Sequence, residues 1–335
     1  MPKRIIICAD GTGNEPTLEA DSNVFKLYRA LTEDSAEQVA YYDQGLGTEK
    51  RPLIGKAFGV GISKNIRDCY EFIVDQYTPG AHVYLFGFSR GAFTVRSLGG
   101  MIARCGLVNW KYRSLTKQAF RYYRSRRHPE KSRRFRQKFS VTLDGLPRTD
   151  VVHFIGVWDT VGALGLPIKW LDKLNPFRHR FHDTRLNQHV PYGYQALAID
   201  DQRRTFHPTL WSEENVPSGQ TIEQLWFAGM HSDVGGGYPE HQLSDIALEW
   251  IIEKAIACGM TFVPNWKSEI AARYDGMMHN SRSGWKRLYR RKVRDVAAIC
   301  AKQGVRPRTH TAVRRRIEDP ACDYRPGNLP AGAVG

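Results

Sequence analysis

The sequence predicts an α/β protein with a mostly parallel central sheet and helices on both faces. Apolar runs of strand length alternate with helical patterns along the chain, which is typical of parallel sheets. Most of these runs end in a glycine-rich turn or an acidic residue. One run, Val83 to Phe88, ends in the pattern Gly87-Phe88-Ser89-Arg90-Gly91 and leads directly into a helical pattern. We therefore expect an open sheet whose turns carry the function.

The first part of the chain supplies two strands and two helices. Lys3 to Ala9 is rich in β-branched residues and predicts a strand, followed by the glycine-rich turn Asp10 to Asn14. Such a turn after a first strand commonly faces a ligand. Asn23 predicts the N-cap of a helix. Gln38 to Tyr42 alternates like a second strand, and a helix is expected from about Lys64 to Tyr77.

The stretch around Ser89 predicts a nucleophile elbow. The turn between strand and helix is sharp, and Gly87 and Gly91 allow the two backbones to approach. The serine oxygen is then exposed near the amino end of the helix, where the dipole favours a developing negative charge. The following helix is predicted from one apolar face: Ala92, Val95, Leu98 and Ile102.

The composition changes after this helix. Lys111 to Lys138 is crowded with Lys and Arg, and aromatic residues lie between them. We interpret this segment as a helical insertion of about residues 108–148 in one domain covering residues 1–319. Two hypotheses remain open: a lid or a surface for anionic head groups, or the solvated face of helices packed on the core.

The remaining predicted strands each end in a polar residue. Val151 to Trp158 is followed by Asp159, and Thr221 to Ala228 leads to His231. A helix is expected over Leu243 to Ile256. Residues 320–335 are expected to form a disordered tail.

Ser89, Asp159 and His231 are the candidate catalytic residues. Serine needs a neighbouring base, and the base needs an orienting group. The chain order Ser, Asp, His is that of α/β-hydrolases, and successive parallel strands bring their carboxyl ends to one edge. We expect Ser89 to attack, His231 to accept and return the proton, and Asp159 to hold the imidazole.

Alternatives remain for each role. Asp233 competes as the orienting carboxylate, although its place two residues after the histidine is unfavourable. His310 ranks second to His231 as the base. Asp159 could cap a turn, and His231 could be a structural histidine. The other histidines weighed are His153, His207 and His241.

The expected oxyanion hole combines two backbone elements. The N–H of Arg90, the residue after the nucleophile, is the first donor. Gly11 and Thr12, in the turn after the first strand, supply the second, because a glycine-rich loop brings bare N–H groups close.

Composition indicates which kinds of partner the protein binds and in which compartment it resides. The chain has 335 residues and a formal net charge of +15, which suggests an anionic partner such as phospholipid, nucleic acid or an acidic carrier protein. The six cysteines form no C-x-x-C and indicate buried reduced thiols. No cofactor is expected. The run Ile5 to Ala9 is too short for a signal-peptide core, so we expect a cytoplasmic protein unless it is exported folded.

Four motifs in order resemble the catalytic domain of type VI secretion phospholipase effectors. They are Cys8-Ala9-Asp10-Gly11-Thr12-Gly13-Asn14, Gly87-Phe88-Ser89-Arg90-Gly91-Ala92, Gly156-Val157-Trp158-Asp159-Thr160-Val161-Gly162 and His231-Ser232-Asp233-Val234-Gly235-Gly236-Gly237-Tyr238. Weaker matches are Ala198-Ile199-Asp200-Asp201-Gln202-Arg203-Arg204 and Leu243-Ser244-Asp245-Ile246-Ala247-Leu248.

This resemblance implies an α/β-hydrolase-like fold and a Ser-Asp-His triad carried by Ser89, Asp159 and His231. It also implies action on phospholipid esters, export by a contractile secretion system and an immunity or inhibitor protein as partner. The effectors are commonly larger and carry membrane-docking regions; here only the basic insertion and the basic tail could serve that purpose.

Four functions compete on the sequence alone. The first is a phospholipase of the A type on glycerophospholipids, and the second is an esterase or thioesterase on a soluble acyl substrate. The third is a phosphate- or nucleic-acid-handling protein, suggested by the charge and by Asp10. The fourth is a metal-dependent hydrolase that uses a set of acidic residues and a histidine: Asp10, Asp159, His231 and Asp233.

Overall fold

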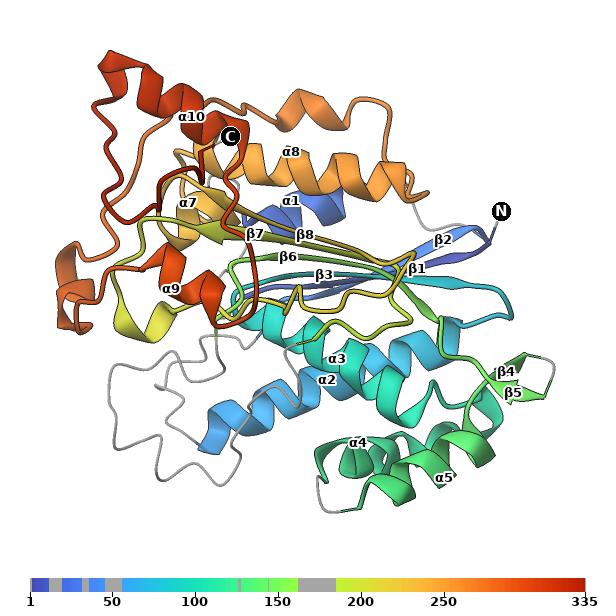
Figure 1. The fold of residues 1–335 in the computed structure, drawn as a ribbon. Helices are drawn as coiled ribbons and strands as arrows, with labels where there is room; N and C mark the ends of the chain where they lie inside the picture. Colours follow the sequence, from blue (N-terminus) through green and yellow to red (C-terminus); the bar gives the residue numbers. More distant parts are fainter. Residues whose placement is uncertain are drawn as a thin grey trace.

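The computed structural model describes residues 2–11, 20–31, 36–45, 56–125, 128–143, 145–161 and 185–334. Its centre is a six-stranded sheet in the order β2-β1-β3-β6-β7-β8, with every neighbouring pair parallel. The strands are β1 (Arg4–Ala9), β2 (Gln38–Asp43), β3 (His82–Phe88), β6 (Val152–Trp158), β7 (Tyr192–Ala198) and β8 (Thr221–Phe227). Helices cover both faces (Figure 1), so the architecture is α/β with a parallel central sheet, as predicted.

The sheet strands are buried on both faces, which explains their continuous apolar runs. Side chains of β1 alternate: Ile5 and Ile7 point to one face, and Ile6 and Cys8 to the other. Across the centre of the sheet, Ala9 lies opposite Gly87 of β3, which sets the end of the first strand beside the serine turn.

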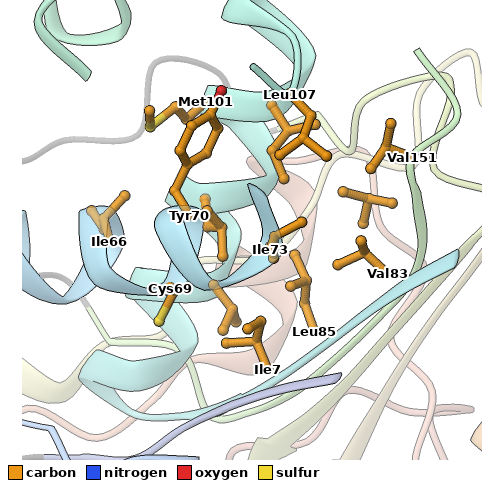
Figure 2. Close-up of a cluster of buried hydrophobic side chains, with 14 of the residues drawn as sticks. Ile7, Ile66, Cys69, Tyr70, Ile73, Val83, Leu85, Met101, Leu107 and Val151 are labelled. Atoms are coloured by element: carbon orange, nitrogen blue, oxygen red, sulfur yellow. The ribbon is translucent and has the colours of Figure 1, made fainter. Parts of the chain in front are cut away.

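One face of the sheet is covered by α2 (Lys56–Gln76) and α3 (Arg90–Cys105). Figure 2 shows the packing: Ile7, Val83 and Leu85 of the strands lie against Ile73 of α2, with Met101 of α3 further out. This face holds the helix that begins at the serine turn, and its dense packing keeps that helix in place.

The opposite face is covered by α1 (Asn23–Arg29) and α8 (Gln242–Ala257). Aromatic residues dominate this side of the core, including Phe86 and Trp158 beside Ile251 of α8. The Trp158 indole also donates a hydrogen bond to the Ala247 carbonyl, 3.2 Å away, which ties β6 to α8.

The segment expected to be an insertion forms an outer layer of helices. It comprises η1 (Trp110–Leu115), α4 (Thr116–Arg124), α5 (Pro129–Phe139) and the antiparallel pair β4 (Thr142–Leu143) and β5 (Leu146–Pro147). Buried Phe120, Tyr123 and Phe135 attach it to the core on the α2 and α3 side (Figure 1). The segment packs on the side of α2 and α3 that faces away from the sheet and does not lie over the carboxyl ends of the strands, so its placement does not support the lid hypothesis.

The carboxyl-terminal part contains α9 (Val296–Ala301), α10 (Thr311–Glu318) and η5 (Pro320–Cys322). With Trp226 of β8, their side chains form a third cluster of buried residues that includes Cys300 and Val313. The expectation of a disordered tail from residue 320 is wrong. Tyr324 is buried in this cluster, and the Asn328 amide donates to the carbonyl of Ile199, 2.9 Å away.

Short helices complete the described part of the chain: α7 (His231–Gly235), η2 (Arg204–Phe206), η3 (Trp266–Glu269) and η4 (Gly284–Leu288). Within the described ranges, no helix has both the length and the apolar character needed to cross a bilayer. The six cysteines are free thiols; four are buried as expected, whereas Cys258 and Cys322 are partly exposed.

Candidate active site

The carboxyl edge of the sheet collects polar side chains from five neighbouring strands. Because all six strands run parallel, the residues that follow them meet at this edge. In sheet order these residues are Asp10 after β1, Ser89 after β3, Asp159 after β6, Asp201 after β7 and His231 after β8.

Ser89 occupies the sharp turn between β3 and α3. Its backbone angles are φ 58° and ψ −115°, a sparsely populated conformation that is common at functional sites. A Cβ added at Gly91 would lie 1.9 Å from the Ala9 carbonyl oxygen, and one at Gly87 would lie 2.6 Å from the Gly91 carbonyl carbon. Only glycines allow this close approach, as the sequence predicted.

Ser89, His231 and Asp159 form one hydrogen-bonded chain. The Nε2 atom of His231 lies 2.8 Å from the Ser89 Oγ, and its Nδ1 atom lies 2.6 Å from Asp159 Oδ2. All three side chains are buried, with Asp159 at 0% exposure and the other two at 5%. The structure thus brings together the three residues selected from the sequence, in the expected order.

Asp159 is held by more than the histidine. Arg294 donates from both terminal nitrogens to the two carboxylate oxygens, at 2.7 and 2.8 Å, and the Ala198 N–H donates to Oδ1 at 3.0 Å. Burial acts to raise the pKa of Asp159, but the charge and hydrogen bonds of Arg294 outweigh it and hold that pKa well below its ordinary value. Asp159 is therefore a carboxylate at neutral pH.

His231 lies between aromatic rings. Its ring centroid is 4.6 Å from that of Phe88 and 5.0 Å from that of Phe206. Burial lowers the pKa of His231, and the hydrogen bond to Asp159 offsets only part of this effect. The imidazole is therefore neutral near pH 7, which is the state in which Nε2 can accept a proton.

The backbone N–H groups expected to form the oxyanion hole differ in where the structure places them. Arg90 is the first residue of α3, so its N–H lies at the amino end of that helix. The N–H of Gly11 donates to Asp10 Oδ1, 2.6 Å away, and is turned toward that carboxylate. Thr12 lies outside the described residues.

The side chain of Asp10 is occupied by hydrogen bonds within the fold. Besides the Gly11 N–H, it accepts hydrogen bonds from the hydroxyls of Ser22 and Tyr42. The Tyr42 oxygen lies 2.9 Å from Asp10 Oδ2. The side chain is 2% exposed, so Asp10 anchors the turn after β1 and is not placed as a nucleophile.

Asp233 does not orient His231. It accepts from the Nδ1 of His279 at 2.6 Å and from the backbone N–H groups of Met230 and His279, each at 3.0 Å. Burial raises the pKa of Asp233. Its role is to hold the turn that begins α7, and the alternative of Asp233 as the orienting carboxylate is wrong.

The other histidines have partners of their own. His310 stacks on Phe227, and its ring nitrogen caps α10. His153 stacks on His82, and both lie at the amino end of their strands. Within the described part of the chain, no cluster of three or more His, Cys, Asp or Glu side chains could hold a metal ion.

Three residues of the site were not predicted from the sequence. Arg294 contacts Asp159 directly, and Asp201 Oδ2 accepts a hydrogen bond from the His231 backbone N–H at 3.3 Å. Arg203 pairs with Asp201 at 2.6 Å and lies over the Phe206 ring. Asp201 and Arg203 lie in one of the weaker matches to the family, which was a usable signal, although strand β7 before them was not predicted. Arg294 lies in a basic stretch that gives no such signal.

Comparison with known proteins places the chain in a family. The family described as "T6SS, Phospholipase effector Tle1-like, catalytic domain" matches residues 3–254. The chain belongs to this family. The Tle1-like match covers the whole central sheet with Ser89, Asp159 and His231, and it ends before α9 and Arg294.

Several relatives of the Tle1-like domain are longer than this chain. Uncharacterized protein YEL023C of Saccharomyces cerevisiae is 29% identical over 227 residues, which cover 61% of this chain and 32% of the yeast protein. A crystal structure of an uncharacterized protein from Pseudomonas aeruginosa matches with 18% identity and a TM-score of 0.49, over 82% of this chain and 49% of the other. A Tle1 effector bound to the VgrG spike has 18% identity and a TM-score of 0.38, over 71% and 51%. The chain thus spans about a third to a half of these relatives.

Proposed function

We propose that this Tle1-like domain is a serine hydrolase that cleaves carboxylic esters of glycerophospholipids. The main support is the chain of two contacts from Ser89 Oγ to His231 Nε2 at 2.8 Å and from His231 Nδ1 to Asp159 Oδ2 at 2.6 Å. A neutral imidazole between a hydroxyl and a carboxylate is the arrangement that activates a serine.

In the first half of the reaction, the Ser89 oxygen attacks the ester carbonyl carbon while His231 Nε2 accepts the hydroxyl proton. The carbonyl oxygen becomes an oxyanion in a tetrahedral intermediate. His231 then donates the proton to the alcohol oxygen, the ester C–O bond breaks, and the alcohol leaves with an acyl group bound to Ser89. Asp159 remains a carboxylate and stabilises the imidazolium throughout.

In the second half, water replaces the alcohol. The water oxygen attacks the acyl carbon while His231 accepts a proton from the water. The new intermediate collapses, the bond between Ser89 and the acyl group breaks, and the serine oxygen takes the proton back from His231. The products are a carboxylic acid and the regenerated enzyme.

The oxyanion must be stabilised by preplaced N–H donors, and loss of one donor typically costs ~3–4 kcal/mol. We assign the Arg90 N–H as the first donor, because it follows the nucleophile at the start of α3. Thr12 remains the proposed second donor on the sequence alone. Gly11 could serve only if its N–H turned away from Asp10.

The proposed substrate class rests on the family and on charge. The family is one of phospholipase effectors, and the net charge of +15 favours an anionic surface. The insertion exposes a set of cations: Lys117, Arg121, Arg124, Lys131, Arg133, Arg134 and Lys138. Export by a secretion system and an immunity protein as partner follow from the same family and are part of this proposal.

A substrate screen of the purified chain tests the proposal. Wild type, Ser89→Ala and the control Ser218→Ala, which changes an exposed serine, are compared on phosphatidylglycerol vesicles and on a soluble short acyl ester. We expect fatty acid release from vesicles by wild type and the control, and none by Ser89→Ala. Activity on the soluble ester alone would support the esterase alternative. Activity that survives Ser89→Ala would overturn the serine mechanism.

A further inference from the structure

Arg294 is a fully buried arginine at the candidate active site. It has 0% exposure and is among the largest fully buried side chains of the described residues. It comes from the segment just before α9, which lies beyond residues 3–254 that match the family. An arginine is rarely buried completely unless it is paired, so its partner is informative.

The partner of Arg294 is Asp159. The two terminal nitrogens donate to the two carboxylate oxygens, at 2.7 and 2.8 Å, in a bidentate pair. The same nitrogens also donate to the carbonyl oxygens of Ala198 and Phe206. Such a planar fork sets the orientation of a carboxylate as well as its charge.

We propose that Arg294 is a positioning residue, which holds the Asp159 carboxylate in the plane and charge state that His231 requires. This inference rests on the proposed function of Ser89, His231 and Asp159. The guanidinium of Arg294 donates to Asp159 and to two backbone carbonyls and not to Ser89, so it acts through Asp159.

The charge of Arg294 matters because Asp159 is buried. Burial alone raises the pKa of this carboxyl, and Arg294 is the strongest influence that lowers it. Removal of the guanidinium would leave a buried carboxylate without its cation. The Asp159–His231 pair would then bind a proton at a higher pH, whichever of the two residues carries it.

Other charged groups lie around the Asp159–His231 pair on neighbouring elements, and a substitution of Arg294 leaves them unchanged. Arg203 pairs with Asp201 and not with Asp159. The charged or titratable groups that interact with Arg294 or His231 from the segments after β7 and before α9 are Asp200, Asp201, Arg203 and His207, and Lys292 faces His207.

The carboxyl-terminal tail anchors Arg294. The Asn328 side-chain amide donates to the Arg294 carbonyl oxygen at 2.9 Å, and the Val296 N–H donates to the Asn328 carbonyl at 3.3 Å. The segment beyond the family match therefore supplies a residue to the site and keeps it there.

The test measures how fast a fluorophosphonate labels Ser89 between pH 4 and 9, using the full chain. We expect Arg294→Met to slow labelling on the order of 10²-fold near pH 7 and to move the acid midpoint upward by about 1 unit or more. Arg294→Lys keeps the charge but loses the fork, so we expect slower labelling with an unchanged midpoint. The matched control is Arg316→Met, since Arg316 is also a buried arginine but bonds to the Tyr274 and Gly276 carbonyls.

Three results would overturn the inference. One is an Arg294→Met profile that keeps the wild-type midpoint, and another is Arg294→Lys labelled at the wild-type rate. If Arg294→Met does not fold, the Arg294→Lys result decides. The third comes from a double-mutant cycle, in which Arg294→Lys is made in the wild type and in Asp159→Asn. We expect Arg294→Lys to slow labelling of the wild type but to have little effect in Asp159→Asn, which lacks the carboxylate. An equal slowing in both would overturn the inference. Wild type that is not labelled at Ser89 would instead refute the proposed function.

Discussion

Gly91 at the start of α3 lies against the end of β1, so closely that a Cβ on it would stand 1.9 Å from the Ala9 carbonyl oxygen. This contact joins the first strand of the sheet to the helix that begins at Ser89. The serine position is therefore set by backbone packing between two elements about 80 residues apart in the chain.

Gly91→Ala should damage both stability and activity. The added methyl group meets backbone atoms that cannot rotate away, so we expect a loss of ~2–4 kcal/mol in the free energy of unfolding. Activity should fall on the order of 10²-fold, because α3 must shift and carry Ser89 with it.

Denaturant unfolding and ester hydrolysis measure these two effects. Gly100→Ala is the matched control in the same helix, where the nearest atom to a new Cβ is the Tyr123 hydroxyl at 3.5 Å. The control should be neutral or stabilise by up to about 1 kcal/mol. Equal effects of both substitutions would contradict the packing argument.

The pH dependence of kcat/KM should reflect the lowered pKa of His231. The base is active when neutral, so activity is present above its pKa and is lost as the pH falls through it. Because burial depresses this pKa in the folded protein, the acid limb should lie below the ordinary histidine value of about 6.5. A profile between pH 4 and 9 on an uncharged soluble ester checks this, and an acid midpoint above pH 7 would contradict it.

Asp159→Asn and Asp233→Asn should behave differently although both carboxylates are buried. Asp159→Asn should lower kcat on the order of 10³–10⁴-fold, because the amide cannot hold the imidazole in the required state. Asp233→Asn should lower stability through its contacts with His279 and Met230, and leave kcat within a few-fold. Steady-state kinetics and thermal unfolding of the two variants distinguish them; similar losses of kcat would undermine the assignment of Asp159.

Removal of the Asn328 side-chain amide should destabilise the segment that carries Arg294. Asn328→Ala loses hydrogen bonds to the carbonyls of Ile199 and Arg294, and we expect a cost of about 1–3 kcal/mol in unfolding free energy. A moderate fall in activity should accompany it, since the segment carrying Arg294 is held less firmly. Hydrogen exchange at the backbone of residues 292–296 provides the local readout, and unchanged protection there would contradict the anchoring role.

The fold and the three residues of the hydrogen-bonded chain could be predicted because their signals are local. A strand with a glycine-flanked serine must turn sharply, and Asp159 and His231 each follow a strand that the apolar runs identify. Parallel pairing then requires them to meet at one edge. Strand β7 was not predicted, and the Asp201 segment after it was recognised only as a weaker match to the family, with no role for Asp201 itself.

What could not be predicted depends on contacts between distant parts of the chain. Arg294 lies 135 residues from Asp159 and is one of many arginines in a basic region, so composition alone describes it as solvated. The order of the tail could not be predicted, because the residues that anchor it, Tyr324 and Asn328, are single residues without periodicity. Asp159 was predicted over Asp233 as the partner of His231, but the contact of Asp233 with His279, which engages it elsewhere, is not visible in any spacing.

The central claim is that Ser89, His231 and Asp159 act as one unit, and a double-variant comparison of turnover tests it most directly. The account predicts that Ser89→Ala lowers turnover on the order of 10⁴–10⁶-fold and that adding His231→Ala costs little more. Losses that multiply, or turnover that persists without the Ser89 hydroxyl, would contradict it.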